Sequence, residues 1–340
     1  MLAPIPAEYW LRNERAEAAF TPSDGLNCSA FRVRLPSGQS VSALAEAPSW
    51  EALRARPSFY GNPILSPFAY GVKDSTLRYH GKEHVLSPTR WGRVAHGLVR
   101  DHAWTVEHTT DTEIRASLTT QDDPQKLAEY PYPFSLTLTY TLSHNELKLA
   151  AAARNLGTDP MPFGFGIHPY VPLPLGTPGQ PTPDSGPQDE IVTSDATRCN
   201  ADGPGASGTP RVQLPPVEGA FDLRRGQSAA GLFEASRARR DRPGLYLTYA
   251  KDPGASGLSW SLASPRQNAI VEIETSPELW AMVLFAPATA EVISPVIGSC
   301  LPGFLDHTDD PARSRDLGLI ELAPGATWTC GATFRVRPLT

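Results

Sequence analysis

The sequence predicts an all-β fold, a large antiparallel β-sandwich with minor peripheral helices. Period-two alternation of apolar and polar residues dominates wherever a pattern can be read. The chain of 340 residues also contains 35 prolines and 27 glycines. Because proline disfavours helix interiors and both residues favour turns, this composition favours many short strands over helices.

The clearest strand pattern is FSLTLTYTL at 134–142, where Leu136, Leu138 and Tyr140 fall on one face and threonines on the other. ELKLAAA at 146–152 follows after the turn-like SHN, so the two segments are predicted to form a hairpin. Further short strands are predicted at 31–35, 76–80, 83–86, 103–108, 112–120, 244–250, 257–263, 269–275, 280–286 and 327–336. Such spacing without intervening helical patterns is typical of a sandwich or barrel. Helices are predicted only around 8–20 and 231–240.

We expect a single domain over residues 1–340. Two stretches near 172–190 and 199–220 are rich in Pro, Gly, Ser and Asp, which predicts long loops. Alternation resumes beyond each loop in the same style, and no internal repeat is visible. The two loops are therefore interpreted as insertions within one domain.

The composition excludes several classes of partner. A net charge of −6 argues against a nucleic-acid surface, and the absence of any run of 18 apolar residues predicts no membrane span. Cys28, Cys199, Cys300 and Cys330 lack CxxC spacing, and the N-terminus lacks a secretory pattern. We therefore expect a soluble, cytoplasmic protein with reduced thiols. The histidines lack metal-ligand spacing, and the residues leave the oligomeric state open.

Four segments in chain order resemble the aldose 1-epimerase (galactose mutarotase) family. They are NPILSPFAYGVKD (62–74), HGLVRDHAWTV (96–106), MPFGFGIHPYVPLP (161–174) and LGLIELAPGATWTCGATFRV (317–336). The resemblance implies the galactose mutarotase-like sandwich, with a sugar-binding cleft on the concave face of one sheet. It also implies interconversion of the α and β anomers of a free aldose, a small-molecule carbohydrate substrate and no cofactor.

The implied reaction needs a base for the C1 hydroxyl proton and an acid for the ring oxygen. By position in the family motifs, His168 matches the acid and His96 a second sugar-contacting histidine. Histidine suits the acid role because its pKa lies near neutral pH. Asp222 falls where the family keeps a sugar-binding Asp after the long loop. Aromatic rings that could stack on a pyranose are Tyr70, Trp91, Tyr170, Phe68 and Trp280.

Two positions depart from the family pattern. Tyr70 and Gly71 stand where the family has an Asn-Arg pair, and Ser294 stands before Pro295 where the family has its basic Glu. A neutral hydroxyl cannot act unaided as that base. Glu272 and Glu274, which share a strand face, could supply a carboxylate or form a solvated face.

Three functions therefore stay open from the sequence. The first is an epimerase whose base has moved or weakened. The second is a carbohydrate-binding protein that has lost its chemistry, with Ser294 as a sugar contact. The third is an acid–base enzyme that acts on a different sugar derivative.

Overall fold

The computed structural model describes most of the chain. The described residues are 8–55, 59–88, 92, 94–176, 190–198, 223–229, 232, 245–287, 292–308 and 310–339. Most of the two predicted loops, residues 177–189 and 199–220, lies outside them, as does all but one residue of the helix predicted at 231–240.

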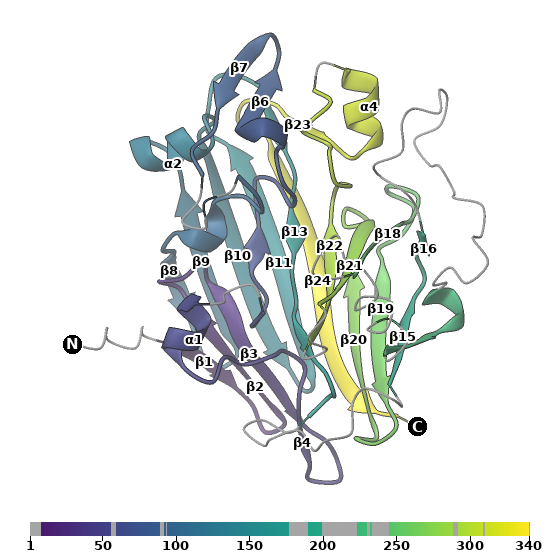
Figure 1. Cartoon of the computed structure of the whole chain (residues 1–340). Helices are drawn as coiled ribbons and strands as arrows, with labels where there is room; N and C mark the ends of the chain where they lie inside the picture. The colour runs from purple at the N-terminus through teal and green to yellow at the C-terminus, as the bar shows by residue number, and fades with distance from the viewer. Residues whose placement is uncertain are drawn as a thin grey trace.

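The largest sheet is antiparallel throughout and forms one layer of the sandwich (Figure 1). In spatial order its described strands are β17 (Gln227–Ser228), β15 (Ile191–Ser194), β19 (Ser259–Ser264), β20 (Ala269–Thr275), β24 (Thr327–Pro338), β11 (Glu146–Asn155), β10 (Phe134–Ser143), β9 (Glu113–Thr119) and β8 (Thr105–Thr109).

A second sheet carries the residues of interest for function. Its order is β16 (Thr197–Arg198), β18 (Leu245–Ala250), β21 (Ala281–Ala286), β22 (Val292–Gly298), β13 (Gly166–Ile167) and β5 (Ile64–Leu65), with β14 (Val171–Pro172) also paired to β22. Smaller sheets are formed by β1 (Tyr9–Arg12), β2 (Ala16–Thr21), β3 (Asn27–Arg34) and β4 (Ser40–Ser42), by β12 (Met161–Phe163) with β23 (Ile320–Leu322), and by β6 (Thr76–Tyr79) with β7 (Lys82–Val85).

Helices are few and peripheral in the described part of the chain. They are the short α1 (Trp50–Ala55), α2 (Pro124–Glu129) and α4 (Pro311–Asp316), with 3₁₀ turns η1 (Lys73–Ser75), η2 (Val99–Asp101) and η3 (Leu223–Arg225). The described elements thus form the large antiparallel β-sandwich with minor peripheral helices that the sequence predicts. No helix among the described residues is long and apolar enough to cross a membrane.

The predicted hairpin is confirmed as β10 and β11, which pair from Phe134↔Asn155 to Ser143↔Glu146. His144 makes the turn possible by adopting a left-handed conformation, with φ of 51°. Burial alternates along β10, so its leucines and Tyr140 enter the core while its threonines stay half-buried. The period-two pattern therefore set both the strand and its orientation.

The helix predicted at 8–20 is wrong, because this segment forms the β1–β2 hairpin. Asn13 explains the difference locally: its side-chain Oδ1 accepts from the backbone N–H groups of Arg15 and Ala16, which makes a turn where a helix would need to continue. Burial of Phe20 at 0% exposure then outweighs the helix propensity of the alanines.

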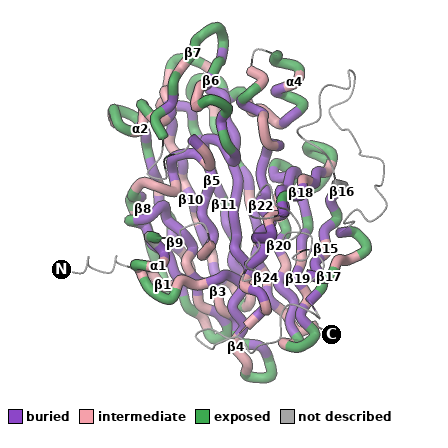
Figure 2. Tube along the Cα trace, in the orientation of Figure 1, coloured by how far each residue is buried: buried purple, intermediate pink, exposed green. Residues whose placement is uncertain are grey.

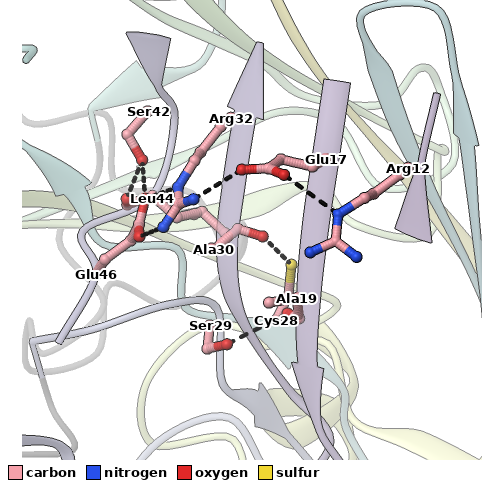
Figure 3. A network of polar contacts seen from close by, with 10 residues as sticks. All are labelled: Arg12, Glu17, Ala19, Cys28, Ser29, Ala30, Arg32, Ser42, Leu44 and Glu46. Atoms are coloured by element: carbon pink, nitrogen blue, oxygen red, sulfur yellow. Dashed lines mark hydrogen bonds and ion pairs between the residues drawn. The ribbon is translucent and has the colours of Figure 1, made fainter. Parts of the chain in front are cut away.

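Polar contacts hold the outer face of this N-terminal sheet together. Arg32 donates from Nη1 to Glu17 at 2.7 Å (Figure 3). Its Nε and Nη2 donate to the two carboxylate oxygens of Glu46. Arg12 extends the network from the other side of Glu17. On the inner face, the ring of Phe20 lies 4.7 Å from that of Tyr140 on β10, which joins the small sheet to the large one.

The core runs between the two main layers. Buried residues follow the centres of the strands, whereas exposed residues collect at the loops and the β6–β7 hairpin (Figure 2). The second sheet is buried on both faces along β22, in which every residue from Val292 to Gly298 is buried. A polar side chain inside β22 is therefore placed in a low-dielectric environment.

Candidate functional site

His168 lies in the tight connection between β13 and β14. Its backbone N–H donates to the carbonyl of Pro63 and to Oδ1 of Asn62, both at 3.1 Å. Two residues later, the N–H of Tyr170 donates to the carbonyl of Gly61 at 2.9 Å. The HPY turn is therefore fixed against the chain that enters β5, and the imidazole has a defined position.

Both ring nitrogens of His168 contact hydroxyl groups. Ser294 Oγ lies 2.8 Å from Nδ1, and the Tyr170 hydroxyl lies 3.1 Å from Nε2. The Tyr170 and His168 rings also stack, with centroids 4.4 Å apart. Because a neutral imidazole has one donor and one acceptor nitrogen, one hydroxyl donates to the ring while the other accepts from it. The three groups form a hydrogen-bonded chain with the imidazole in the middle.

The pKa of His168 is held well below its ordinary value of 6.5. Burial is the main cause, because a 6% exposed imidazole loses the hydration that stabilises its charged form. Electrostatic interactions with His96 and Arg100 lower the pKa further. His168 is therefore a neutral imidazole at physiological pH.

His96 is held in place by its backbone. It adopts a left-handed conformation with φ of 66°, and its N–H donates to the carbonyl of Tyr70 at 3.1 Å. The next residue, Gly97, has φ of 69° and bridges to Ser66. A Cβ atom at Gly97 would lie 2.0 Å from the Ser66 carbonyl oxygen, so only glycine fits this close approach.

The two histidines form a pair. The ring of His96 meets that of His168 edge-to-face with centroids 5.5 Å apart. Nδ1 of His96 lies 2.7 Å from the carbonyl oxygen of Ala69. Unlike His168, which is buried, His96 is half-buried.

The other predicted site residues divide into three groups. Tyr170 and Ser294 contact His168 directly, as described above. Tyr70 is buried, and its backbone carbonyl accepts the hydrogen bond from the N–H of His96. Trp91 and Asp222 lie outside the described residues.

Three other candidates have contacts outside the histidine pair. Glu272 sits on β20 of the large sheet, where it pairs with Arg337 at 2.7 Å and with Arg335. Phe68 packs in the core against Tyr130. Trp280 lines a separate surface hollow with Trp328 of the large sheet. Glu272 therefore has a structural role, and its partner Glu274 is exposed and also contacts Arg335.

Sequence reasoning missed two residues of this site. Asn62 fixes the backbone of His168 through Oδ1, while its Nδ2 is buried without a hydrogen-bond partner among the described residues. Arg100, in η2, supplies a positive charge that His168 senses, and its Nε lies 3.8 Å from a carboxylate oxygen of Asp101. Both residues fall within segments that carry the family resemblance, but nothing in the sequence pattern separates them from their neighbours.

The comparisons with known proteins concern the family and the fold. Residues 31–185 match the sequence model of the aldose 1-epimerase family. No curated protein matches the chain.

Several solved structures share the fold over nearly the whole chain. A galactose mutarotase-like protein from Clostridium acetobutylicum superposes with a TM-score of 0.72 at 17% identity, covering 97% of this chain and 94% of that one. A galactose mutarotase-like protein from Lactobacillus casei gives 0.70 at 18% identity, covering 97% and 100%. An aldose epimerase homologue from C. elegans gives 0.69 at 16% identity, covering 98% and 100%.

Proposed function

We propose that the protein interconverts the α and β anomers of a free aldose by acid–base catalysis, a proposal supported by the match of residues 31–185 to the aldose 1-epimerase family model. The observation that carries this proposal is the pair of imidazoles with ring centroids 5.5 Å apart. The substrate class is a small neutral sugar, which needs hydrogen bonds and an apolar contact face rather than a strong counter-charge.

The spacing of the pair suits the anomeric centre of a pyranose. Its hydroxyl and ring oxygens are bonded to the same carbon, and a catalytic group reaches each within about 3 Å. An acid and a base that serve both oxygens must therefore lie within about 6–8 Å of each other. The two histidines meet this condition.

His168 is proposed as the acid that protonates the ring oxygen. Its hydrogen bonds to Ser294 and Tyr170 support this role, because a sugar oxygen could replace one hydroxyl while the other keeps the ring oriented. A neutral imidazole can act as an electrophile or a hydrogen-bond and proton donor to the developing charge on the ring oxygen.

The proposal is tested by measuring the anomerisation of α-glucose and α-galactose by polarimetry or NMR exchange. We expect the protein to exceed buffer catalysis and the variant His168→Asn to lose about 10²–10⁴-fold in kcat. The exposed His108 on β8 provides a matched control, His108→Asn, which should keep full activity. Failure to exceed buffer catalysis with every aldose tested would contradict the proposal.

The second candidate function is sugar binding without chemistry. Ser294 favours it, because a hydroxyl replaces the carboxylate base and no described carboxylate is among the charges that shift the pKa of His168. Titration calorimetry separates the two functions: sugar binding with no turnover supports the binding protein, whereas turnover excludes it. Binding that disappears in His168→Asn would place the ligand at the same residues.

A further inference from the structure

We infer that His96 is the general base of this reaction and accepts the proton of the anomeric hydroxyl at Nε2. The inference rests on the proposed function and assigns the role that the serine before Pro295 cannot fill. It depends on the hydrogen bonding of the two imidazoles and on the backbone that holds His96.

The hydrogen bond to Ala69 fixes the tautomer of His96. A carbonyl oxygen only accepts hydrogen bonds, so Nδ1 of His96 must carry the proton that it shares at 2.7 Å. In the neutral ring, Nε2 then carries a lone pair and no proton. An imidazole with its distal nitrogen set as an acceptor, and its other nitrogen hydrogen-bonded to an orienting group, has the arrangement of a general base.

The other groups that the structure describes at the site are less suited to this role. His168 has hydroxyls at both nitrogens, and the depressed pKa of its buried ring makes it a poor proton acceptor. Ser294 is fully buried and is committed to His168. Of the carboxylates that the sequence offered, Glu272 is bound by two arginines in the large sheet.

The backbone conformation of His96 also supports the inference. A non-glycine residue with a left-handed φ of 66° costs free energy, on the order of 1–2 kcal/mol, and is retained only where surrounding contacts enforce it. Here the neighbouring bridges of Ala95 to Gly71 and of Gly97 to Ser66 enforce it from both sides. The strained backbone carries a half-buried side chain beside His168. Strained residues cluster at active sites, where the strain can be part of the mechanism.

The proton balance of the step is complete. The anomeric O–H bond breaks and its proton goes to His96 Nε2, while the bond between C1 and the ring oxygen breaks and its electron pair stays on the ring oxygen. That oxygen takes the proton of His168, so the sugar becomes the open-chain aldehyde. Rotation about C1–C2 presents the other face. Ring closure reverses both transfers: His96 gives its proton to the carbonyl oxygen as the new anomeric hydroxyl forms, and the hydroxyl that becomes the ring oxygen returns its proton to His168.

The left-handed backbone of His96 makes a chemical-rescue experiment practical. Glycine is the residue best suited to this conformation, so His96→Gly should fold and leave an imidazole-sized space. His144→Gly is the matched control, because His144 is also left-handed, with φ of 51°, and lies in the distant β10–β11 turn. Anomerisation is measured for both variants with and without added imidazole.

We expect His96→Gly to lose about 10²–10⁴-fold in kcat with a much smaller change in KM. Imidazole should restore activity through a rate term proportional to both protein and imidazole concentration, which separates rescue from catalysis by free imidazole. Substituted imidazoles of higher pKa should rescue more strongly, a dependence that a purely structural role would not produce. His144→Gly should keep wild-type activity and show no such term.

Two results would overturn the inference. Wild-type kcat in His96→Gly would place the base elsewhere, and a loss that no imidazole restores in a variant with the wild-type circular dichroism spectrum would leave His96 with a binding role only. In both cases the wild-type protein still anomerises sugars, so the proposed function stands. An inactive wild-type protein would instead contradict the proposed function itself.

Discussion

At the scale of single residues, His168 and His96 have identical side chains in opposite surroundings. His168 is buried, stacks on Tyr170 and has hydroxyl groups at both nitrogens. His96 is half-buried and has one nitrogen fixed by a backbone carbonyl. These different surroundings support the different roles that we propose for the two rings, acid for His168 and base for His96.

The depressed pKa of His168 predicts a pH dependence of stability. Below pH 6.5 the unfolded chain protonates this residue while the folded protein does not, so the free energy of unfolding falls as pH falls toward the folded pKa. The loss should therefore be measurable between pH 7.5 and 5.5. Urea unfolding at both pH values should show that wild type loses more stability over this interval than His168→Asn does.

The exposed histidine again supplies a control for this measurement. His108→Asn should lose as much stability as wild type over the same pH interval, because residue 108 lies on an exposed edge strand. An equal loss in wild type and His168→Asn would show that His168 titrates normally in the folded protein.

At the scale of elements, the site is assembled where short strands and turns meet. β5 and β13 pair with each other, and β13 also pairs with β22. The 94–99 segment joins them through the backbone bridge between Gly97 and Ser66. These elements are only two to seven residues long, so their positions depend on each other rather than on strong local propensity. Close backbone approaches such as that of Gly97 are what hold them together.

Gly97→Ala should therefore destabilise the protein strongly. The methyl group would meet the Ser66 carbonyl oxygen at 2.0 Å and would also strain the left-handed backbone. Gly81 has a similar φ of 74° with nothing within 4 Å, so Gly81→Ala measures the strain alone, about 1–2 kcal/mol. We expect Gly97→Ala to cost at least about 2 kcal/mol more by urea unfolding, and equal losses would contradict the packing described here.

At the scale of the whole molecule, the layers share one core. The N-terminal sheet packs on the large sheet through Phe20 and Tyr140, both at 0% exposure. We propose that the chain forms a single domain and unfolds as one cooperative unit, since this contact joins the most N-terminal strands to the centre of the fold.

Calorimetry of Phe20→Ala tests this proposal. Truncation should cost about 3–5 kcal/mol through the cavity it leaves and should lower the temperature of one unfolding transition without splitting it. Val85, which is 78% exposed, offers a control substitution, Val85→Ala, expected to change stability by less than about 0.5 kcal/mol. A separate early transition in Phe20→Ala would show that the N-terminal sheet is an independent unit.

The sequence determined the strand content and the β10–β11 hairpin, because alternation is a local property. It also singled out His96 and His168 by their short motifs, and the structure places their rings in contact. It failed at 8–20, where alanine-rich helix propensity was overridden by the Asn13 turn and by burial against the large sheet.

Only the tertiary structure decided that Ser294 contacts the His168 ring, that Ala69 fixes the tautomer of His96, and that Glu272 is held by arginines of the large sheet. These contacts join residues distant in the chain, or depend on backbone direction, and neither is encoded in a local pattern of residue types.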